Sequence, residues 1–347
     1  GNTVEITGWS GTSVTVTLTY TTAATYTNRA KVTSTSAAYT DSAYSSSDSI
    51  IISASWAFQG SNSGFAAGGW NLSNVIDKYS FTSDGNSVDH GDLSVSRYGA
   101  SGTSSTTHGY NSGGSDNTQS LTTIDKFSFT SSAGAADVGD LTQVRQQTAS
   151  SSSSTHGYAS SGGRWGTTAS DVIDKWSFAS DGNATDVGNI TVARDSLTGQ
   201  SSSDYGYASG GTTGSYSDVV DKFSFSSDGD ATDVGNITVA RNGVCGQSST
   251  THGYTSGGSI SSGKSDIIDK FTFSSDANAT DVGDLTAGNK QQAGSSSTDY
   301  GYMACGNRAT GAKTNVIEKF SFASDANATD VGDVTVGREN YPAGTQY

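Results

Sequence analysis

The sequence predicts an all-β fold, a β-propeller of six four-stranded blades, and three observations support this prediction. A segment of the type Ile-Asp-Lys-aromatic-Ser-Phe recurs six times, at spacings of 47 to 49 residues. Turn-forming residues divide each repeat into four short strands. The 347-residue chain contains 44 Gly, one Pro and 10% aromatic residues, which is typical of many short strands joined by turns. Six such repeats are the pattern of a propeller, in which each repeat forms one twisted blade.

The strands are expected in the same order in every repeat. The second strand ends at a Gly pair, as in 206–211, and a loop of variable sequence follows it. The Ile-Asp-Lys segment, for example 173–178, forms the third strand. An Asp/Asn/Gly turn over 180–186 and a short fourth strand over 190–194 close the unit, and a Ser/Gly-rich run opens the next. The absence of a 3.6-residue apolar period excludes a helical solenoid and leaves a parallel β-helix as the competing fold.

Charge and composition exclude several classes of protein. The formal net charge of −15 argues against a general affinity for nucleic acid or anionic lipid. No stretch of about 18 apolar residues is present, so we expect no membrane insertion. Cys245 and Cys305 stand in unlike contexts and are expected to be buried rather than to bind a metal. Gly1 stands in place of an initiator Met without a signal-peptide pattern, so a processed or partial product is expected.

The repeat resembles a known family. The Gly pair that closes the second strand, the aromatic residue of the third strand and the Arg after the fourth resemble the kelch repeat, whose family fold is a β-propeller. The sequence departs from that pattern at Val187, where a Trp is usual, and at Cys305, where the first Gly of the pair is lost. The phrases IDKFSF, SDANATDVGD and STTHGYTSGG are also similar to the Ser/Thr/Gly-rich kelch-like repeats of marine bacteriophage structural proteins.

This resemblance, which spans residues 56–347, implies a non-enzymatic component of the virion, such as a tail fibre or appendage. Its implied partners are other virion proteins and a host-surface glycan or receptor, without nucleic acid, and it is compatible with a homo-oligomer. The alternative is a secreted, extracellular lectin or adhesin of a microbe. A propeller enzyme, such as a kelch-type oxidase or a glycan lyase, is a third interpretation. We do not favour it, because no asymmetric set of catalytic residues stands out in the sequence.

Two kinds of closure are compatible with the sequence. The first strand of blade 1 is expected near 56–59, and the stretch 342–346 resembles the start of another first strand. Either six blades close on themselves and residues 1–55 form an attachment segment, or the C-terminal strand joins N-terminal strands in a seventh blade. The alternating stretch 13–20 is such an N-terminal strand. We favour six blades, because no Gly pair or Ile-Asp-Lys segment follows that strand.

The charged residues of the repeat are predicted to be structural. The pair Asp174-Lys175 and the residue Arg194 have counterparts around the repeats. An active site needs one asymmetric set of matched groups, and symmetric copies do not provide it. We expect these charges to pair between strands or blades. No nucleophile elbow or phosphate loop is present either, so we predict no enzymatic activity.

Two groups of residues have the chemistry of metal ligands. His108, His156 and His252 occupy equivalent positions in three repeats, and zinc accepts three His ligands, but separate blades hold such positions far apart. The Asp-rich turns over 181–186 and 228–233 offer the oxygens that calcium prefers, without the order of an EF-hand loop. Asx turns account for the same residues. We therefore expect no cofactor, and calcium is the ion that these turns would suit.

The repeats differ mainly on one face. In a four-stranded antiparallel blade, the first-to-second and third-to-fourth loops lie on one face, here the constant face, and the remaining connections lie on the other, here the variable face. Exposed Trp, Tyr, Arg and amide side chains are typical of recognition surfaces, including sugar sites. Unconstrained loop drift is the alternative. The predicted ligand-binding residues of the variable face are Trp70, Asn117, Arg164, Trp165, Tyr216, Lys264, Arg308, Lys313, Tyr98 and Tyr341.

Overall fold

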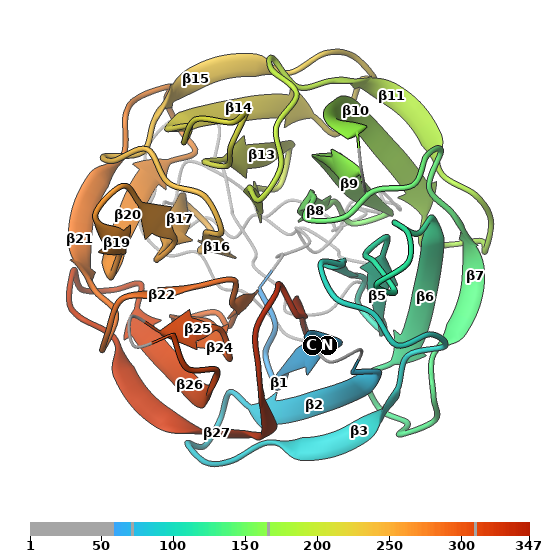
Figure 1. Ribbon diagram of the computed structural model, residues 1–347, viewed down its shortest axis with the longest axis horizontal. Helices are drawn as coiled ribbons and strands as arrows, with labels where there is room; N and C mark the ends of the chain where they lie inside the picture. Colours follow the sequence, from blue (N-terminus) through green and yellow to red (C-terminus); the bar gives the residue numbers. More distant parts are fainter. Residues whose placement is uncertain (1–58, 71–72, 165–166, 309–310) are drawn as a thin grey trace, which may run out of the picture. The chain divides into compact units, whose positions relative to one another are not determined.

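The computed structural model describes residues 59–70, 73–164, 167–308 and 311–347, which form six four-stranded antiparallel sheets around a central axis (Figure 1). The prediction of an all-β propeller with six blades is confirmed. The expectations for residues 1–55 and for Trp165 lie outside the described residues. Within those ranges, no helix has the length and apolar character needed to cross a membrane.

The strands follow the same order from the axis outward in each blade. Blade 1 contains β28 (Ala343–Gln346), β1 (Ser63–Ala67), β2 (Val75–Ser80) and β3 (Val88–Asp92). Blade 2 contains β4 (Ser101–Ser104), β5 (His108–Ser112), β6 (Thr123–Ser128) and β7 (Ala136–Asp140). Blade 3 contains β8 (Ala149–Ser152), β9 (His156–Arg164), β10 (Thr167–Ser177) and β11 (Thr185–Asn189).

The second half of the chain repeats this order. Blade 4 contains β12 (Thr198–Ser201), β13 (Tyr205–Ser209), β14 (Val219–Ser224) and β15 (Thr232–Asn236). Blade 5 contains β16 (Cys245–Ser248), β17 (His252–Ser256), β20 (Ile267–Thr272) and β21 (Thr280–Asp284). Blade 6 contains β23 (Ala293–Ser296), β24 (Tyr300–Ala304), β26 (Thr314–Ser321) and β27 (Thr329–Arg338). Two short pairs, β18 (Ser259–Ile260) with β19 (Gly263–Lys264) and β22 (Asn289–Lys290) with β25 (Asn307–Arg308), lie on the variable face.

The C-terminal strand closes blade 1. β28 pairs antiparallel with β1, from Gly64 opposite Gln346 to Ala67 opposite Ala343. The expectation of a first strand near residues 56–59 was therefore wrong, and so was the seven-blade alternative. Gly344 explains why this segment can form the innermost strand of blade 1. A Cβ at this position would lie 1.9 Å from the carbonyl oxygen of Gly294 in the innermost strand of blade 6. β28 thus has the small residue that close packing at the axis requires.

The fourth strand begins earlier in the chain than the sequence predicted. β11 covers Thr185–Asn189, whereas we expected a turn over 180–186 and a strand over 190–194. Thr185 and Asp186 already pair with the third strand, and a β-bulge shifts the register next to Gly188. Gly188 has a φ of 148° and so accommodates this irregularity. Ile190 lies beyond the strand and is buried in the core between blades 3 and 4. β27 of blade 6 alone among the described fourth strands continues through both segments.

The apolar core lies between neighbouring blades. The aromatic residue of each second strand stacks on the Phe that follows the third strand of the next blade, as Tyr158 does on Phe225 with 4.8 Å between ring centroids. The six stacked pairs have centroid separations of 4.6 to 5.1 Å. These contacts explain why each repeat carries an aromatic residue at both positions. Cys245 and Cys305 are buried, as expected.

Hydrogen bonds join the innermost strands around the axis. At the end of each of these strands, a backbone N–H donates to a side-chain oxygen of the next blade, as in Ser104 N to Ser152 Oγ at 3.0 Å. The series continues through Ser201, Ser248, Ser296 and Gln346 and returns to Ser104, with distances of 2.9 to 3.4 Å. We call this closed cycle the axial ring. It places all six blades in a fixed relation to one another.

Candidate functional site

The constant face repeats one contact between neighbouring blades. Lys126 Nζ donates to Asp181 Oδ1 at 2.8 Å, and the third-strand Lys of four further blades contacts the equivalent Asp of the next blade. Blade 2 has Ser132 in place of this Asp. Lys78 of blade 1 therefore has no Asp partner in blade 2, and it donates to the backbone oxygen of Phe129 at 3.2 Å instead. The Lys and the turn Asp that the repeats share therefore have a structural role, which is to connect neighbouring blades.

The turn Asn residues also connect blades. Asn183 Oδ1 accepts a hydrogen bond from the backbone N–H of Asp140 in the preceding blade at 3.1 Å. Asn183 Oδ1 and Asp181 Oδ1, two of the oxygens that a calcium ion would use, thus have partners in the neighbouring blade. In the part of the chain that the structure describes, no group of three or more His, Cys, Asp or Glu side chains could hold a metal ion.

The three equivalent His residues lie on the constant face, each beside a Thr. His156 Nδ1 lies 2.8 Å from Thr155 Oγ1, and the same distance separates His108 from Thr107 and His252 from Thr251. Partial burial lowers the pKa of all three rings. Each His thus has a local partner in its own blade.

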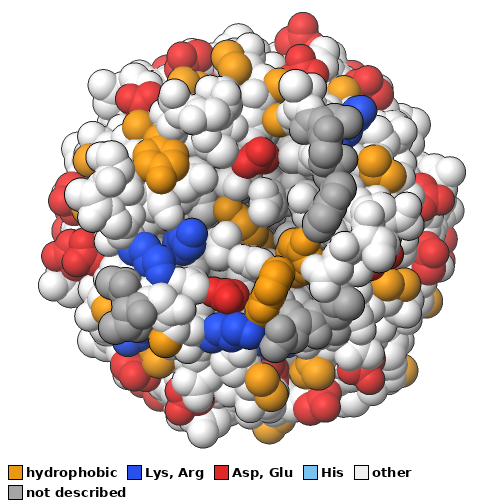
Figure 2. All heavy atoms as spheres, in the orientation of Figure 1, with side chains coloured by type: hydrophobic (Ala, Val, Ile, Leu, Met, Phe, Trp, Pro, Cys, Tyr) orange, Lys and Arg blue, Asp and Glu red, His pale blue; other side chains and the backbone are white. Residues whose placement is uncertain are grey.

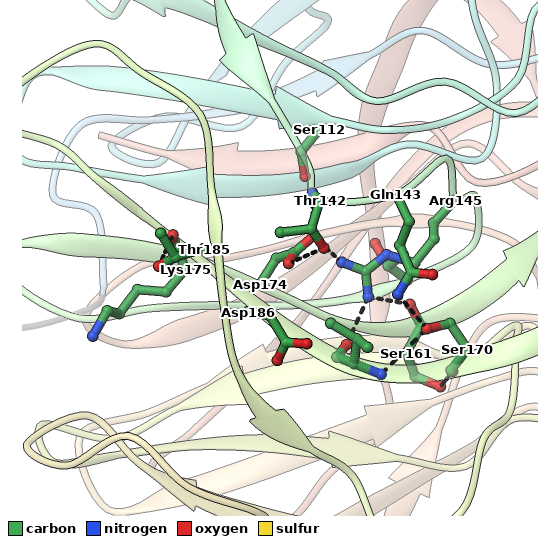
Figure 3. A network of polar contacts seen from close by, with 12 residues as sticks. Ser112, Thr142, Gln143, Arg145, Ser161, Ser170, Asp174, Lys175, Thr185 and Asp186 are labelled. Carbon is green, nitrogen blue, oxygen red and sulfur yellow. Dashed lines mark hydrogen bonds and ion pairs between the residues drawn. The ribbon is translucent and has the colours of Figure 1, made fainter.

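Buried Arg–Asp pairs connect the blades nearer the variable face (Figure 3). Arg145 pairs with Asp174 of the next blade, and both side chains have no exposed surface. Arg145 Nη1 also donates to the backbone oxygens of Ser161 at 3.2 Å and Val172 at 2.6 Å. Thr142 Oγ1 donates to Asp174 at 2.6 Å. The predicted pairing of these charges between blades is confirmed. The additional hydrogen bonds are needed because a buried ion pair must satisfy its donors and acceptors within the protein.

The same pair recurs at four further blade interfaces. The residues are Arg97 with Asp125, Arg194 with Asp221, Arg241 with Asp269 and Arg338 with Asp77. Burial lowers the pKa of the Arg97, Arg145 and Arg241 guanidinium groups, and the partner Asp opposes this effect at each one. The pairs are thus a repeated structural element and not one reactive centre.

The interface between blades 5 and 6 departs from this pattern. Asn289 stands where the other blades have the Arg, and Glu318 replaces the Asp. Glu318 is buried, and its partner is Arg308 from the variable loop of the same blade, with Nη2 3.0 Å from Oε1. Burial raises the pKa of Glu318. The cation that is fully buried elsewhere is here 26% exposed on the variable face.

The sequence-predicted residues lie on the variable face with different degrees of exposure. Trp70 is 38% exposed and Tyr216 41% exposed. Asn117 and Lys313 are exposed, whereas Arg164, Lys264 and Arg308 are half-buried. Tyr98 and Tyr341 are 7% and 8% exposed, so these two are not the exposed rings that we expected. Tyr98 packs against the Trp70 ring, and Tyr341 lines a pocket at the axis.

Part of this set is brought together where blades 5, 6 and 1 meet. Lys264 Nζ donates to Asn307 Oδ1 and to the backbone oxygen of Arg308. Asn307 Nδ2 donates to Glu339, whose backbone oxygen accepts a hydrogen bond from Trp70 N at 2.8 Å. The structure does not bring Asn117, Arg164 or Tyr216 into this group, because they belong to blades 2, 3 and 4.

Trp70 and Tyr98 form the aromatic end of this group. Their ring centroids are 5.7 Å apart in an edge-to-face arrangement, so the buried Tyr98 supports the exposed Trp70. At the other end, Lys and Arg side chains gather near β19 and β22 (Figure 2). We call the group Lys264, Lys290, Arg308, Lys313 and Trp70 the basic–aromatic surface.

A pocket opens at the axis beside this surface. It is lined by the innermost strands and by link residues such as Gln147, Leu197 and Tyr341, and with its open mouth it contains about 610 Å³ of empty space. Burial raises the pKa of the Tyr341 hydroxyl to about 12. Hydrogen bonds to Ser196 and Gln291 act in the opposite direction and offset part of this effect. Tyr341 thus contributes to the wall of the axial pocket.

Sequence reasoning missed several residues of the site. Lys290, Asn307 and Glu339 were not among the predicted residues, and Glu318 and Asn289 were not recognised as departures from the repeat. The last two are visible when the six repeats are aligned, because only blade 6 has Glu in its third strand and only blade 5 lacks the Arg. The contacts of Asn307 have no equivalent signal, since they depend on the loop conformation.

The fold and site define the class of protein as a six-bladed β-propeller with one constant and one variable face. A scan against protein-family models and a search of curated proteins found no match to this chain. The functional assignment therefore depends on the site itself.

Proposed function

We propose that this protein is a non-enzymatic binding propeller whose variable face recognises a host-surface glycan, as a fibre or appendage component of a bacteriophage virion. The observation that carries the proposal is the difference between the two faces. On the constant face the same Lys–Asp contact recurs between blades. The variable face has unlike loops with exposed Trp70 and Tyr216. The virion location is supported by the similarity of the repeat phrases to those of phage structural proteins.

A non-enzymatic role is supported by the partners of the charged residues. Five Arg residues at blade ends form ion pairs with the Asp of the next blade. Exposed aromatic rings provide flat apolar surfaces with a polar edge, which suits the faces of sugar rings. An exposed ring supported from below, as Trp70 is by Tyr98, loses little conformational entropy on binding.

A glycan array tests the binding part of the proposal. The full chain is expected to bind at least one class of glycan, and the double variant Trp70→Ala/Tyr216→Ala is expected to lose that binding. The constant-face variant His156→Tyr is the control, because blades 4 and 6 carry Tyr205 and Tyr300 at that position. No bound glycan, or equal binding by all three proteins, would overturn the proposal.

Mass spectrometry of purified particles tests the virion part. The chain is expected in the particle fraction at a fixed ratio to the capsid protein. Recovery only from particle-free culture fluid would contradict the virion location and would support a secreted lectin or adhesin instead.

A further inference from the structure

The Lys and Arg residues of the described chain fall into structural and non-structural groups. The third-strand Lys of each blade contacts the next blade on the constant face. The Arg at the end of every blade except the fifth is buried in an ion pair. The Lys and Arg residues that remain are Arg164, Lys264, Lys290, Arg308 and Lys313. All of these lie on the variable face, and all but Arg164 belong to blades 5 and 6 or their link.

The β22–β25 pair brings these cations together. Asn289 lies opposite Arg308, and Lys290 lies opposite Asn307. Lys290 is near enough to lower the pKa of Lys264, in addition to the larger effect of burial. Lys290 makes no ion pair or side-chain hydrogen bond with any residue that the structure describes. A concentration of positive charge is thus held at one place on a chain whose net charge is −15.

Two carboxylates offset only part of this charge. Glu318 is buried below Arg308, and Glu339 is engaged with Asn307. Neither Lys290 nor Lys313 forms an ion pair among the described residues, so their charges are not offset by a paired carboxylate there. Holding like charges together without enough counter-charge is unfavourable for the isolated protein. Such an arrangement is favoured when an anionic ligand supplies the missing charge.

The aromatic part of the surface is continuous with the cations. Asn307 contacts both Lys264 and Glu339, and Glu339 is hydrogen-bonded to the backbone of Trp70. The cations of blades 5 and 6 therefore lie along the same edge of the variable face as the exposed Trp ring of blade 1. Asn289 and Glu318, which replace the Arg and the Asp of the repeat, lie along this edge as well, together with Arg308, the partner of Glu318.

We infer that the basic–aromatic surface binds an acidic polysaccharide, with Lys290, Lys313 and Arg308 contacting its carboxylate or sulfate groups and Trp70 stacking on a sugar ring. This inference rests on the proposed function and specifies its ligand class and its place on the face. We favour a polysaccharide over a nucleic acid duplex, because the exposed Trp70 ring can stack on the face of a sugar ring, whereas the bases of a duplex are stacked on one another and offer no free face. The Trp ring adds an uncharged contact that a purely electrostatic site lacks.

Binding to immobilised polysaccharides by the full chain tests this inference. The probes are polygalacturonate, dextran sulfate and neutral dextran, with a DNA duplex and phosphatidylserine vesicles as further anions. The decisive variant is Lys290→Ser, which removes an unpaired charge. Its matched control is Lys78→Ser, which removes the same charge from the constant face, where Lys78 donates to a backbone oxygen and lies over the Phe65 ring without an ion pair among the described residues.

We expect binding to polygalacturonate or dextran sulfate and at least about tenfold weaker binding to neutral dextran. Lys290→Ser should weaken acidic binding about fivefold, and Lys290→Ser/Lys313→Ser about twentyfold, with a smaller loss at high salt. Lys78→Ser should stay within about twofold of the unmodified protein. Trp70→Ala should weaken binding at all salt concentrations, because ring stacking is not screened.

Other outcomes separate this inference from the proposed function. Glycan binding that is confined to neutral sugars, or that is unchanged in Lys290→Ser, overturns the acidic site and leaves the proposed function in place. Binding to DNA or vesicles as tight as to polygalacturonate indicates a non-specific polyanion surface and also overturns it. No binding to any polysaccharide or array glycan overturns both.

Discussion

The backbone N–H of Gln346 donates to Ser104 Oγ at 3.0 Å, and this contact closes the axial ring between the last strand of the chain and blade 2. Gln346 Oε1 in turn accepts from the backbone N–H of Ser296 at 3.4 Å. The longer side chain therefore takes the place of the Ser that the other five innermost strands provide. Because β28 also pairs with β1, one short strand connects blades 6, 1 and 2.

We expect Gly344→Ala to destabilise the propeller strongly. A Cβ at this position would lie 1.9 Å from the carbonyl oxygen of Gly294, and backbone cannot yield as a flexible side chain does. The expected loss is about 3 kcal/mol or more in the free energy of unfolding. Gly337→Ala is the control, because the added Cβ there meets nothing closer than 3.4 Å. Urea denaturation followed by Trp fluorescence compares the two, and equal midpoints would contradict a tightly packed axis.

Removing one partner of a buried ion pair is predicted to lower the free energy of unfolding more than replacing both partners by apolar residues. Arg145→Met leaves Asp174 buried without its cation, and we expect a loss of about 3 to 5 kcal/mol in the free energy of unfolding. Arg145→Met/Asp174→Leu removes both charges and should recover most of that loss. Chemical denaturation of both variants measures the difference. A double variant as unstable as the single one would show that the backbone contacts of Arg145 matter more than its charge.

The fold was predictable because its signals recur. Six copies of the third strand gave the number of blades, and the Gly pairs located the second strands. The stretch 342–346 resembles a first strand in the sequence, but its place in blade 1 was not predictable in the same way, because the pairing of β28 with β1 joins the two ends of the repeat array and leaves no signal within a single repeat. The fourth strand was misplaced because its residues, Thr185 to Asn189, have the composition of a turn.

The candidate site was predictable only in part. Loop variability located the variable face and residues such as Trp70 and Lys264. The burial of Tyr98 was not visible, since a Tyr in a link has the same sequence signal whether it is exposed or packed under Trp70. The grouping of Lys264 with Arg308 depends on the β22–β25 pair and on Asn307, which are properties of loop conformation and not of the repeat.

Both thiols are predicted to be unreactive in the folded protein. Cys245 and Cys305 are fully buried, and burial raises the pKa of the Cys305 thiol to about 11 and that of Cys245 further still. A thiol reagent such as 5,5′-dithiobis(2-nitrobenzoate) attacks the thiolate, which is both scarce and inaccessible here. We expect no reaction at pH 8 until the protein is unfolded in guanidinium, when two thiols react. Rapid reaction of one thiol without denaturant would show that its blade opens locally.

Stability is expected to fall as the pH is lowered through the titration of the constant-face His residues. Burial lowers the pKa of His108, His156 and His252, so the unfolded chain binds their protons more readily than the folded one. Their contribution is therefore fully present above the ordinary His pKa of about 6.5 and is lost as the pH falls below it through the folded-state value.

The chain itself provides the variant that tests this pH dependence. Tyr205 and Tyr300 occupy the equivalent positions of blades 4 and 6, so replacing the three His by Tyr should preserve packing and remove the titrating groups. Thermal unfolding midpoints measured between pH 5.5 and pH 7.5 should fall less steeply toward acid in the triple variant than in the unmodified protein. Parallel pH profiles would contradict the assignment of this acid sensitivity to the three His residues.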